Sequence, residues 1–404
     1  MHIIFIAPQP FFIERGTPIA IRSYLEAVSF LNSSEKIIPT IHLITCNSGK
    51  DIELGTTKHY RAPLPKFIAY TEVGISFKKL INDFAILLYV FFLIFKLGKK
   101  NISYLHCVEE ALFIGYFAKK ILGINYVYDM DSVMSDQVVN KWKMLSRISK
   151  LLKSLEDTSI KNAKSVLAVC KLLGDRAIES GAKKVTILED PAFSLPENII
   201  PHEEIKLLFQ NLAGKKIVLY AGNLENYQGI DLLINSFAKT IEIINQKGQK
   251  NNVHLLIVGG SSNHRRIYQE QAEKLGVTPH VTFFNPVPKE QLSFFYRNSA
   301  CLVSPRSEGI NTPMKIYGYL ITGTPIVATN LPTHTQVLTS DVAFLADATT
   351  DSFAEAIYQA ISDRELAEKK AESAKKLGTT SYSEETFNRR AQEFFLSTLE
   401  NNHD

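Results

Sequence analysis

The stretch SPRSEGINTPMKIYGYLITGTPIVATN, residues 304–330, decides the fold expected for the second half of the chain. It begins with a polar loop that contains Glu308, continues as a short amphipathic helix that carries Lys315, and ends in an apolar run rich in β-branched residues. A loop, a helix and a buried strand in this order are typical of a parallel sheet. The stretch therefore predicts a ligand site where a carboxylate, backbone amides and one lysine lie together at the end of such a sheet.

The same alternation of strands and helices extends over the whole chain, with helices expected at 17–31 and 111–122. At 404 residues the chain is long enough for two domains. A proline-rich stretch at 190–204 separates two series of strands and is the expected linker. The expected strands are 2–7, 40–46, 102–107, 125–131, 165–170 and 184–189, then 215–222, 253–260, 280–284, 299–305, 324–330 and 342–346.

This pattern predicts an α/β protein with two Rossmann-like domains that face each other across a cleft. We expect an N-terminal domain at 1–195 and a C-terminal domain at 205–380. Residues 381–404 are expected to form a helix that packs back on the first domain.

Composition excludes several classes of protein. A hydrophobic content of 45% with 21% charged residues is typical of a folded soluble chain. The four cysteines, Cys46, Cys107, Cys170 and Cys301, are far apart, which argues against a zinc site or a disulfide framework and suits a reducing cytoplasm. The first ten residues lack a basic segment and resemble a strand, so we expect no signal peptide.

Positive charge is concentrated in the first half of the chain. Residues 1–195 contain 25 Lys and Arg against 18 Asp and Glu, whereas the remainder contains 20 against 23. The same half contains an apolar run, FAILLYVFFLIF at 84–95, with lysines on both sides; it is too short to cross a bilayer, which needs about 20 residues. It is either a buried helix or a helix that lies on a membrane. The amphipathic, lysine-rich stretch 140–157 leaves the same two interpretations open.

Two glycine-containing loops follow strands of the second half. In the first, Gly222 and Asn223 precede Gln228 at the start of an amphipathic helix, where free amides are able to hold a phosphate. In the second, Gly259 and Gly260 precede a helix with basic residues, but neither the GxGxxG spacing nor a Walker lysine is present. A dehydrogenase or an NTPase is therefore disfavoured. The alternative is that these glycines only shape the turns.

Several motifs in one order resemble the retaining GT-B glycosyltransferases of family 4. In the second half these are GNLENYQGIDLL, LLIVGG, VTFFNPVPKEQLSFFY, the S-x-E-G-x-x-x-P segment and G-T-P-I-V-A-T. The first half resembles the acceptor domain of the family more loosely, through APQPFFIERGTP, HCVEEALFIG and YDMDS. The resemblance implies two domains of the GT-B type and a nucleotide-sugar substrate, without a cofactor.

In that family the first glutamate of a Glu-x7-Glu motif contacts the donor sugar, and this role falls on Glu308. The second glutamate, which binds the nucleotide ribose, falls on Ile316 or Gly318 depending on the direction of counting, and neither is acidic. The usual phosphate-binding Arg and Lys fall on Asn223 and Gln228. Candidate replacement cations are Lys315, the first choice, with Arg306 and Arg265.

The resemblance and the loop pattern together give a set of candidate site residues. Asp129-Met130-Asp131 also matches the manganese-binding D-x-D of the GT-A fold, but a second α/β repeat is unexpected there, so we expect no metal site. Val108 stands where the family often carries a histidine. The catalytic candidates are Glu308, Lys315 and His106; the donor-binding candidates are Arg15, Gly16, Gly222, Asn223, Gln228, Gly259, Gly260, Arg306, Gly309, Asn311 and Thr312; the acceptor-side candidates are Glu109, Glu110, Asp129 and Asp131.

The expected function is transfer of a sugar, with retention, from a nucleotide-sugar donor to a glycan or lipid-linked acceptor in the synthesis of cell-surface polysaccharide or glycolipid. We expect a cytoplasmic protein in peripheral contact with the anionic inner face of the plasma membrane, and no nucleic-acid partner. Two alternatives are a non-catalytic scaffold subunit with the same fold and a nucleotide-sugar epimerase.

Overall fold

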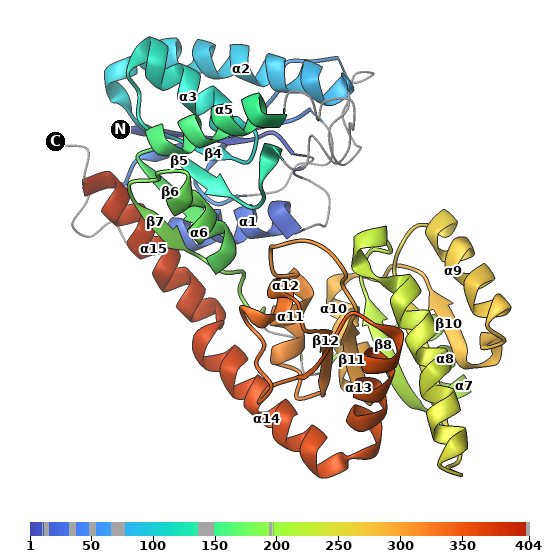
Figure 1. Ribbon diagram of the computed structural model, residues 1–404. Coiled ribbons are helices and arrows are strands. Elements are labelled where there is room, and N and C mark those ends of the chain that lie inside the picture. Colours follow the sequence, from blue (N-terminus) through green and yellow to red (C-terminus); the bar gives the residue numbers. More distant parts are fainter. Residues whose placement is uncertain are drawn as a thin grey trace. The chain divides into compact units, whose positions relative to one another are not determined.

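The computed structural model describes residues 1–9, 11, 16–31, 38–47, 54–65, 77–135, 149–193, 196 and 198–400. The chain divides into two compact units, the first made of Met1–Asp190 with Phe387–Asp404 and the second of Pro191–Thr386. Figure 1 shows the helices and strands of both. The divisions therefore fall at Asp190 and Thr386, close to the expected limits of 195 and 381.

The first unit is built on a parallel sheet. Within its described residues the sheet has seven strands in the order β3-β2-β1-β4-β5-β6-β7. Ile4 of β1 lies opposite His42 of β2 and Leu105 of β4, so β1 is central. Apolar residues occupy both faces of the inner strands because helices cover both sides. The strands are β1 (His2–Ala7), β2 (Thr40–Thr45), β3 (Lys58–Arg61), β4 (Ile102–Val108), β5 (Tyr126–Met130), β6 (Ser165–Ala168) and β7 (Val185–Ile187).

The two faces of this sheet have separate hydrophobic cores. Ile4 and Ile6 point to the face covered by α2, α3, α5 and α6, whereas Ile3 and Phe5 point to the face covered by α1 and α15 (Figure 1). This follows from the two-residue period of a strand. The helical elements are α1 (Gly16–Ser29), α2 (Phe77–Leu97), the short 3₁₀ helix η2 (Lys99–Asn101), α3 (Ala111–Leu122), α5 (Ser149–Asn162) and α6 (Lys171–Glu179).

The last helix of the chain, α15 (Glu384–Glu400), completes the first unit. Phe387, Phe394 and Phe395 are buried in the core beside α1. The Gln392 Nε2 donates to the Ala27 carbonyl of α1 at 2.7 Å, and Lys164 donates to the Thr398 carbonyl at 2.7 Å. The end of the chain is thus an integral part of the first unit.

The second unit repeats the plan. Its described residues form a six-stranded parallel sheet in the order β10-β9-β8-β11-β12-β13. One core packs α8, α9 and α13 on the sheet, and a second packs α7, α10, α11 and α14. The strands are β8 (Lys216–Ala221), β9 (Val253–Val258), β10 (Val281–Phe284), β11 (Cys301–Ser304), β12 (Ile326–Thr329) and β13 (Phe344–Ala346).

The helices of the second unit fill every gap between these strands. They are α7 (Glu203–Asn211), η4 (Asn226–Gln228), α8 (Ile230–Gln246), α9 (Ser262–Lys274), η5 (Thr278–His280), α10 (Lys289–Arg297), α11 (Met314–Leu320), α12 (Pro332–Thr335), α13 (Thr350–Ser362) and α14 (Arg364–Ser381).

The predicted α/β class with two parallel sheets is confirmed, and each of the twelve expected strands has a counterpart. Strand β3 was not predicted. Its sequence KHYR has no alternation and no apolar run, and its residues are exposed or half-buried at the edge of the sheet. A short edge strand of this kind is formed by pairing with β2 and leaves almost no pattern in the sequence.

Candidate active site

Strand order locates the places where each sheet is able to hold a ligand. In the first sheet β1 lies between β2 and β4, and in the second β8 lies between β9 and β11. Chain connections leave such a central strand and its neighbour in opposite directions, which opens a crevice at their carboxyl ends. The loops after β1 and β4 carry Gln9 and Glu109, and the loops after β8 and β11 carry Gly222 and Arg306. Most of the candidate residues therefore lie at one of these two positions.

Two glycines of the second unit are required by close packing of the backbone. A Cβ on Gly229, at φ +70°, would lie 2.1 Å from the Pro305 carbonyl oxygen. A Cβ on Gly259, at φ +118°, would lie 2.2 Å from the Gly222 carbonyl oxygen. No larger residue fits either turn. These two glycines bring the three loops after β8, β9 and β11 together.

Gly222 has a different role, because it leaves room for Lys315. A Cβ on Gly222 would lie 2.8 Å from the Lys315 Nζ. The ammonium lies 3.3 Å from the Gln228 Oε1 and 3.8 Å from the centre of the Tyr220 ring. Burial, and secondly the nearby Arg306, lower the pKa of Lys315 well below its usual value. No described carboxylate forms an ion pair with this amine, so the protonated form has no described counter-ion.

The two arginines proposed as replacement cations serve the loops instead. The Arg306 guanidinium donates to the Glu308 carbonyl at 2.7 Å and to the backbone and side-chain oxygens of Asn311, each at 3.0 Å. Arg265 donates to the Gly260 carbonyl at 2.5 Å and to the Asn285 Oδ1 at 2.8 Å. Both guanidinium groups hold loop carbonyls in place. Arg306 therefore shapes the loop, and its role as a donor ligand stays a prediction.

The loop from Arg306 to Thr312 presents Glu308 to solvent. The Glu308 side chain is exposed, and no described group forms a hydrogen bond or an ion pair with its carboxylate. Gly309 has a φ of +105°, and a Cβ there would lie 2.5 Å from the Arg306 Nη2. The Asn311 carbonyl also accepts from the Thr333 Oγ1 at 2.7 Å, and Thr312 is buried. Asn311 and Thr312 thus support the loop.

A buried histidine that sequence reasoning missed supports the same loop. The His334 Nε2 lies 2.8 Å from the Ser304 Oγ, and its Nδ1 lies 2.9 Å from the Thr329 Oγ1. The Thr329 hydroxyl in turn donates to the Arg306 carbonyl at 2.6 Å. Burial lowers the pKa of His334 to about 3, so the ring is neutral. The THT sequence after an expected strand gives only a weak signal, because a polar turn has the same composition.

The two positions at which the family resemblance places the second glutamate differ in their surroundings. Ile316 is fully buried in the core of the second unit. Gly318 is partly exposed, and a Cβ built on it would meet no atom within 4 Å. Only position 318 has room for a side chain that reaches a ligand.

The remaining donor-side candidates have smaller roles in the structure. Asn223 is exposed, and its carbonyl accepts from the Tyr220 hydroxyl at 2.6 Å. Gln228 is buried and contacts Lys315. A Cβ on Gly260 would lie 2.4 Å from the Leu224 side chain, so that glycine is a packing requirement. In the first unit Gly16 begins α1 with open space around it, and Arg15 lies outside the described residues.

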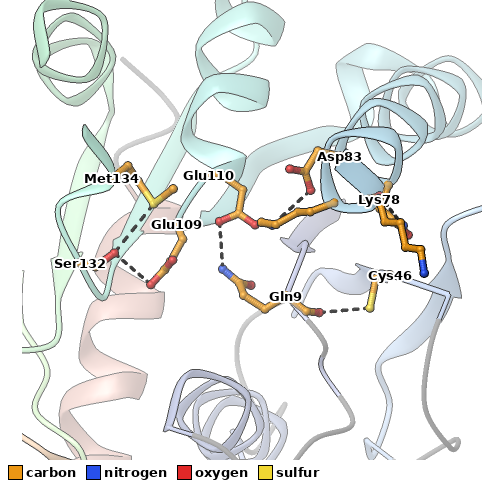
Figure 2. A network of polar contacts seen from close by, with 10 residues as sticks. Gln9, Cys46, Lys78, Asp83, Glu109, Glu110, Ser132 and Met134 are labelled. Carbon is orange, nitrogen blue, oxygen red and sulfur yellow. Dashed lines mark hydrogen bonds and ion pairs between the residues drawn. The ribbon is translucent and has the colours of Figure 1, made fainter. Parts of the chain in front are cut away.

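Acidic residues gather at the carboxyl ends of β4 and β5 in the first unit. Glu109, which follows β4, has a φ of +48°, the left-handed region that a residue other than glycine seldom adopts. Its carboxylate accepts from the Ser132 hydroxyl at 3.2 Å (Figure 2). The next residue, Glu110, forms a buried ion pair with Lys79 of α2, which also contacts Asp83 at 3.4 Å. Glu109 is therefore held by the loop after β5, whereas Glu110 is paired with α2.

His106 lies beneath the acidic group and not within it. Its ring is fully buried and stacks on Phe5 with centres 4.0 Å apart. The Nε2 lies 3.1 Å from the Asp129 Oδ2. A ring in this place is not able to touch a substrate, so His106 is corrected from a catalytic residue to one that positions the Asp129 carboxylate.

Burial and mutual repulsion raise the pKa of several carboxyl groups in this region. The pKa of Asp131 is raised well above its usual value by burial first, then by Asp129 and Glu109, with the Thr17 hydrogen bond opposing the change. Burial also raises the pKa of Glu109, which Lys79 opposes. The pKa of Asp190 is raised to about 7 by burial, Asp129 and Glu189. Such groups are able to donate to hydroxyl oxygens as well as accept from hydroxyls. No group of three or more metal ligands occurs among the described residues.

Replacement of Asp190 by asparagine should stabilise the protein at alkaline pH. The folded chain retains this proton up to about pH 7, whereas an unfolded chain releases it near pH 4. The wild type therefore loses free energy of unfolding as pH rises from about 4 to 7. We expect Asp190→Asn to remove part of that loss and to be more stable at pH 8 by on the order of 2 kcal/mol. Urea denaturation of both proteins at pH 5 and pH 8 measures this, and an equal loss in both would contradict it.

Comparisons with known proteins agree with this description. Residues 204–377 match the family of glycosyl transferases group 1. An uncharacterized glycosyltransferase, MJ1607 of Methanocaldococcus jannaschii, is 24% identical over 292 residues, which cover 69% of this chain and 71% of that protein. The solved structure of sucrose-phosphate synthase from Thermosynechococcus elongatus is 16% identical with a TM-score of 0.76 over 99% of each chain. Anabaena HepE in complex with UDP-glucose is 15% identical with a TM-score of 0.71, over 98% of this chain and all of HepE.

The fold and the comparisons define the class: the protein is an enzyme, a glycosyltransferase with the GT-B fold. More narrowly, residues 204–377 of its second unit match the family of glycosyl transferases group 1.

Proposed function

We propose that the protein transfers a sugar, with retention of configuration, from a nucleoside diphosphate sugar to a hydroxyl group of a glycan or lipid-linked acceptor, without a metal or cofactor. The acceptor oxygen forms a bond to the anomeric carbon on the face from which the diphosphate leaves, and the hydroxyl proton passes to the leaving diphosphate. Stabilisation of that leaving group by fixed charge lowers the barrier. Synthesis of cell-surface polysaccharide or glycolipid is the setting that we propose.

The unpaired ammonium of Lys315 is the observation that carries this proposal. It lies beside the loop that follows β8, where the Lys315 Nζ is 3.3 Å from the Gln228 Oε1. The family resemblance places a phosphate-binding cation at position 228 itself. Lys315 thus brings a positive charge from α11 to the space where relatives carry it on the loop. The Anabaena HepE structures with UDP and UDP-glucose show that a protein of this fold binds such a donor.

Glu308 is the proposed contact to the donor sugar, because its carboxylate is exposed on a loop that Arg306 and His334 hold in place. In the first unit, Glu109, Asp129 and Asp131 are the proposed acceptor-side groups. Protonated and ionised carboxyls together are suited to a polyhydroxyl ligand, since a hydroxyl both donates and accepts.

A donor screen with total lipid and oligosaccharide extracts tests the proposal. Purified protein is incubated with UDP-, GDP- and other nucleotide sugars, and mass spectrometry detects products that carry one extra sugar. We expect a product with one donor class and at least a tenfold lower yield with Glu308→Ala. Glu368→Ala, which removes an exposed carboxylate from α14 of the same unit, is the control and should keep full activity. Equal yields from Glu308→Ala and the wild type would exclude the site.

The absence of an acid at both Ile316 and Gly318 bears on how tightly the donor ribose is held. Calorimetric titration with UDP and GDP measures this affinity. Binding of neither nucleotide would contradict the proposed donor class.

A further inference from the structure

Helix α2 has two apolar faces, of which one is buried and the other is exposed to solvent. On one face Ile86, Val90, Leu93 and Ile94 are buried in the core of the first unit. On the other, a row of large side chains is exposed to solvent along the whole helix. These are Phe77, Leu80, Phe84, Leu88, Phe92 and Phe95, which we call the α2 stripe, with exposed fractions between 49% and 76%.

The α2 stripe has the spacing of one helical face. Its steps of three and four residues keep the side chains in one line. Over 21 residues the helix is about 31 Å long. Solvent-exposed apolar surface of this extent is uncommon on a soluble protein and marks a contact with a membrane or another molecule.

Helix α3 packs beside α2, and α5 packs beside α3, on the same face of the sheet (Figure 1). Phe117 and Ile121 of α3 are exposed, and so are Leu151 and Leu155 of α5. Among the described residues, half of the twenty exposed large hydrophobic side chains thus belong to α2, α3 and α5.

The exposed charges near the α2 stripe are positive, which indicates the kind of partner that this surface binds. Exposed lysines surround it at α2, η2, α3 and α5. They are Lys78, Lys96, Lys99, Lys100, Lys120, Lys150, Lys153 and Lys161. Three of them, Lys150, Lys153 and Lys161, line a shallow hollow beside α5, together with the carboxylate-bearing Asp157 and the hydroxyl residues Ser154, Thr158 and Ser180.

The described acidic groups of α2 and α5 each interact with another group of the first unit, although Asp157 is partly exposed. Asp83 contacts Lys79, and Asp157 forms an ion pair with Arg176 at 2.6 Å. Glu156 is buried and accepts from the Met134 and Ser135 amides at 2.8 and 3.1 Å. Apolar side chains ringed by unopposed lysines suit a surface of acyl chains and anionic headgroups, whereas a protein partner would need matching acids.

We propose that this face of the first unit docks on an anionic lipid bilayer, with α2 parallel to the membrane plane and the α2 stripe inserted among the acyl chains. Among the described residues α2 is the one helix long and apolar enough to span a membrane. Its other face is part of the protein core, and the buried Lys79–Glu110 ion pair fixes it there, so it lies on the bilayer and does not cross it. The proposal is independent of sugar transfer.

Vesicle flotation of the full chain without any donor tests the proposal. We expect binding to vesicles of phosphatidylcholine with 30% phosphatidylglycerol, and release by alkaline carbonate. Phe84→Glu with Leu88→Glu should abolish the binding, because both side chains are exposed and their replacement leaves the core intact. The matched control is Leu207→Glu with Ile267→Glu, two equally exposed apolar residues of the second unit, which should bind like the wild type.

The lysines are tested separately. Lys96→Gln, Lys99→Gln and Lys100→Gln should each weaken binding to the anionic vesicles about fivefold. Equal binding to pure phosphatidylcholine would overturn the anionic part of the proposal, and resistance to carbonate would overturn the parallel orientation. Absence of vesicle binding, or light scattering that shows a dimer lost in the Phe84→Glu and Leu88→Glu variant, would overturn lipid as the occupant.

Discussion

Lys315→Met should lower the affinity for the nucleoside diphosphate donor by about ten- to a hundredfold while raising the stability of the protein. A charged hydrogen bond to phosphate contributes about 1.5–3 kcal/mol, which gives the loss of affinity. The gain in stability arises because the ammonium is held beside Arg306 and burial lowers its pKa. Methionine fills a similar volume without a charge. Calorimetric titration with the donor and thermal unfolding measure the two effects on the same samples.

Lys274→Met is the matched control for Lys315, because it removes an exposed lysine at the end of α9 in the same unit. It should change neither the affinity for the donor nor the stability.

Binding of the donor should also take up protons, since the arriving diphosphate raises the lowered pKa of Lys315. Titrations in buffers of different ionisation enthalpy detect this uptake, and Lys315→Met should lack it. If Lys315→Met bound the donor as tightly as the wild type, the ammonium would have only a structural role.

The fold was largely predictable from the sequence because strands of parallel sheets are buried on both faces. Runs such as HIIFIA at β1 and VHLLIV at β9 have no polar alternation and end at loops, so their positions are visible without a structure. The edge strand β3 shows the limit of this signal. Its partner β2 stabilises it, and a partner distant in the chain is absent from any local pattern.

The site was predictable in outline but not in the role of each residue. Sequence placed Lys315, Arg306 and Arg265 in one group as cations near a loop. What separates them is the direction of each side chain: two guanidinium groups turn back to backbone carbonyls, and the ammonium alone lies beside the space left by Gly222. Such directions depend on the φ of glycines and on close packing between loops. Neither the φ of a glycine nor the packing between loops is predictable from the local sequence pattern.

His106 and Glu110 illustrate the same limit in the first unit. Both are polar residues at the end of a strand, which is a valid sign of a site. The stacking of His106 on Phe5 and the pairing of Glu110 with Lys79 depend on residues that lie about 100 and 31 positions away. The strand register that brings these partners together was beyond the sequence pattern.

Lys79→Met should destabilise the protein by about 3–5 kcal/mol, the usual cost of removing one partner from a buried ion pair. The Lys79 side chain is 8% exposed and that of Glu110 is 12% exposed, so the variant would leave a carboxylate buried without a cation (Figure 2). Asp83 would lose its contact too; burial already raises its pKa, which Lys79 opposes. The free energy of unfolding in urea at pH 8 measures the effect.

Two variants distinguish loss of this pair from loss of a lysine in general. Lys78→Met, at the exposed neighbouring position on α2, should leave stability unchanged within about 0.5 kcal/mol. The double variant Lys79→Met with Glu110→Gln should recover most of the loss, because a neutral amide no longer needs a cation. A deficit that persisted in the double variant would mean that the Lys79 side chain stabilises α2 by packing, and that α2 is attached to the first unit by its apolar face alone.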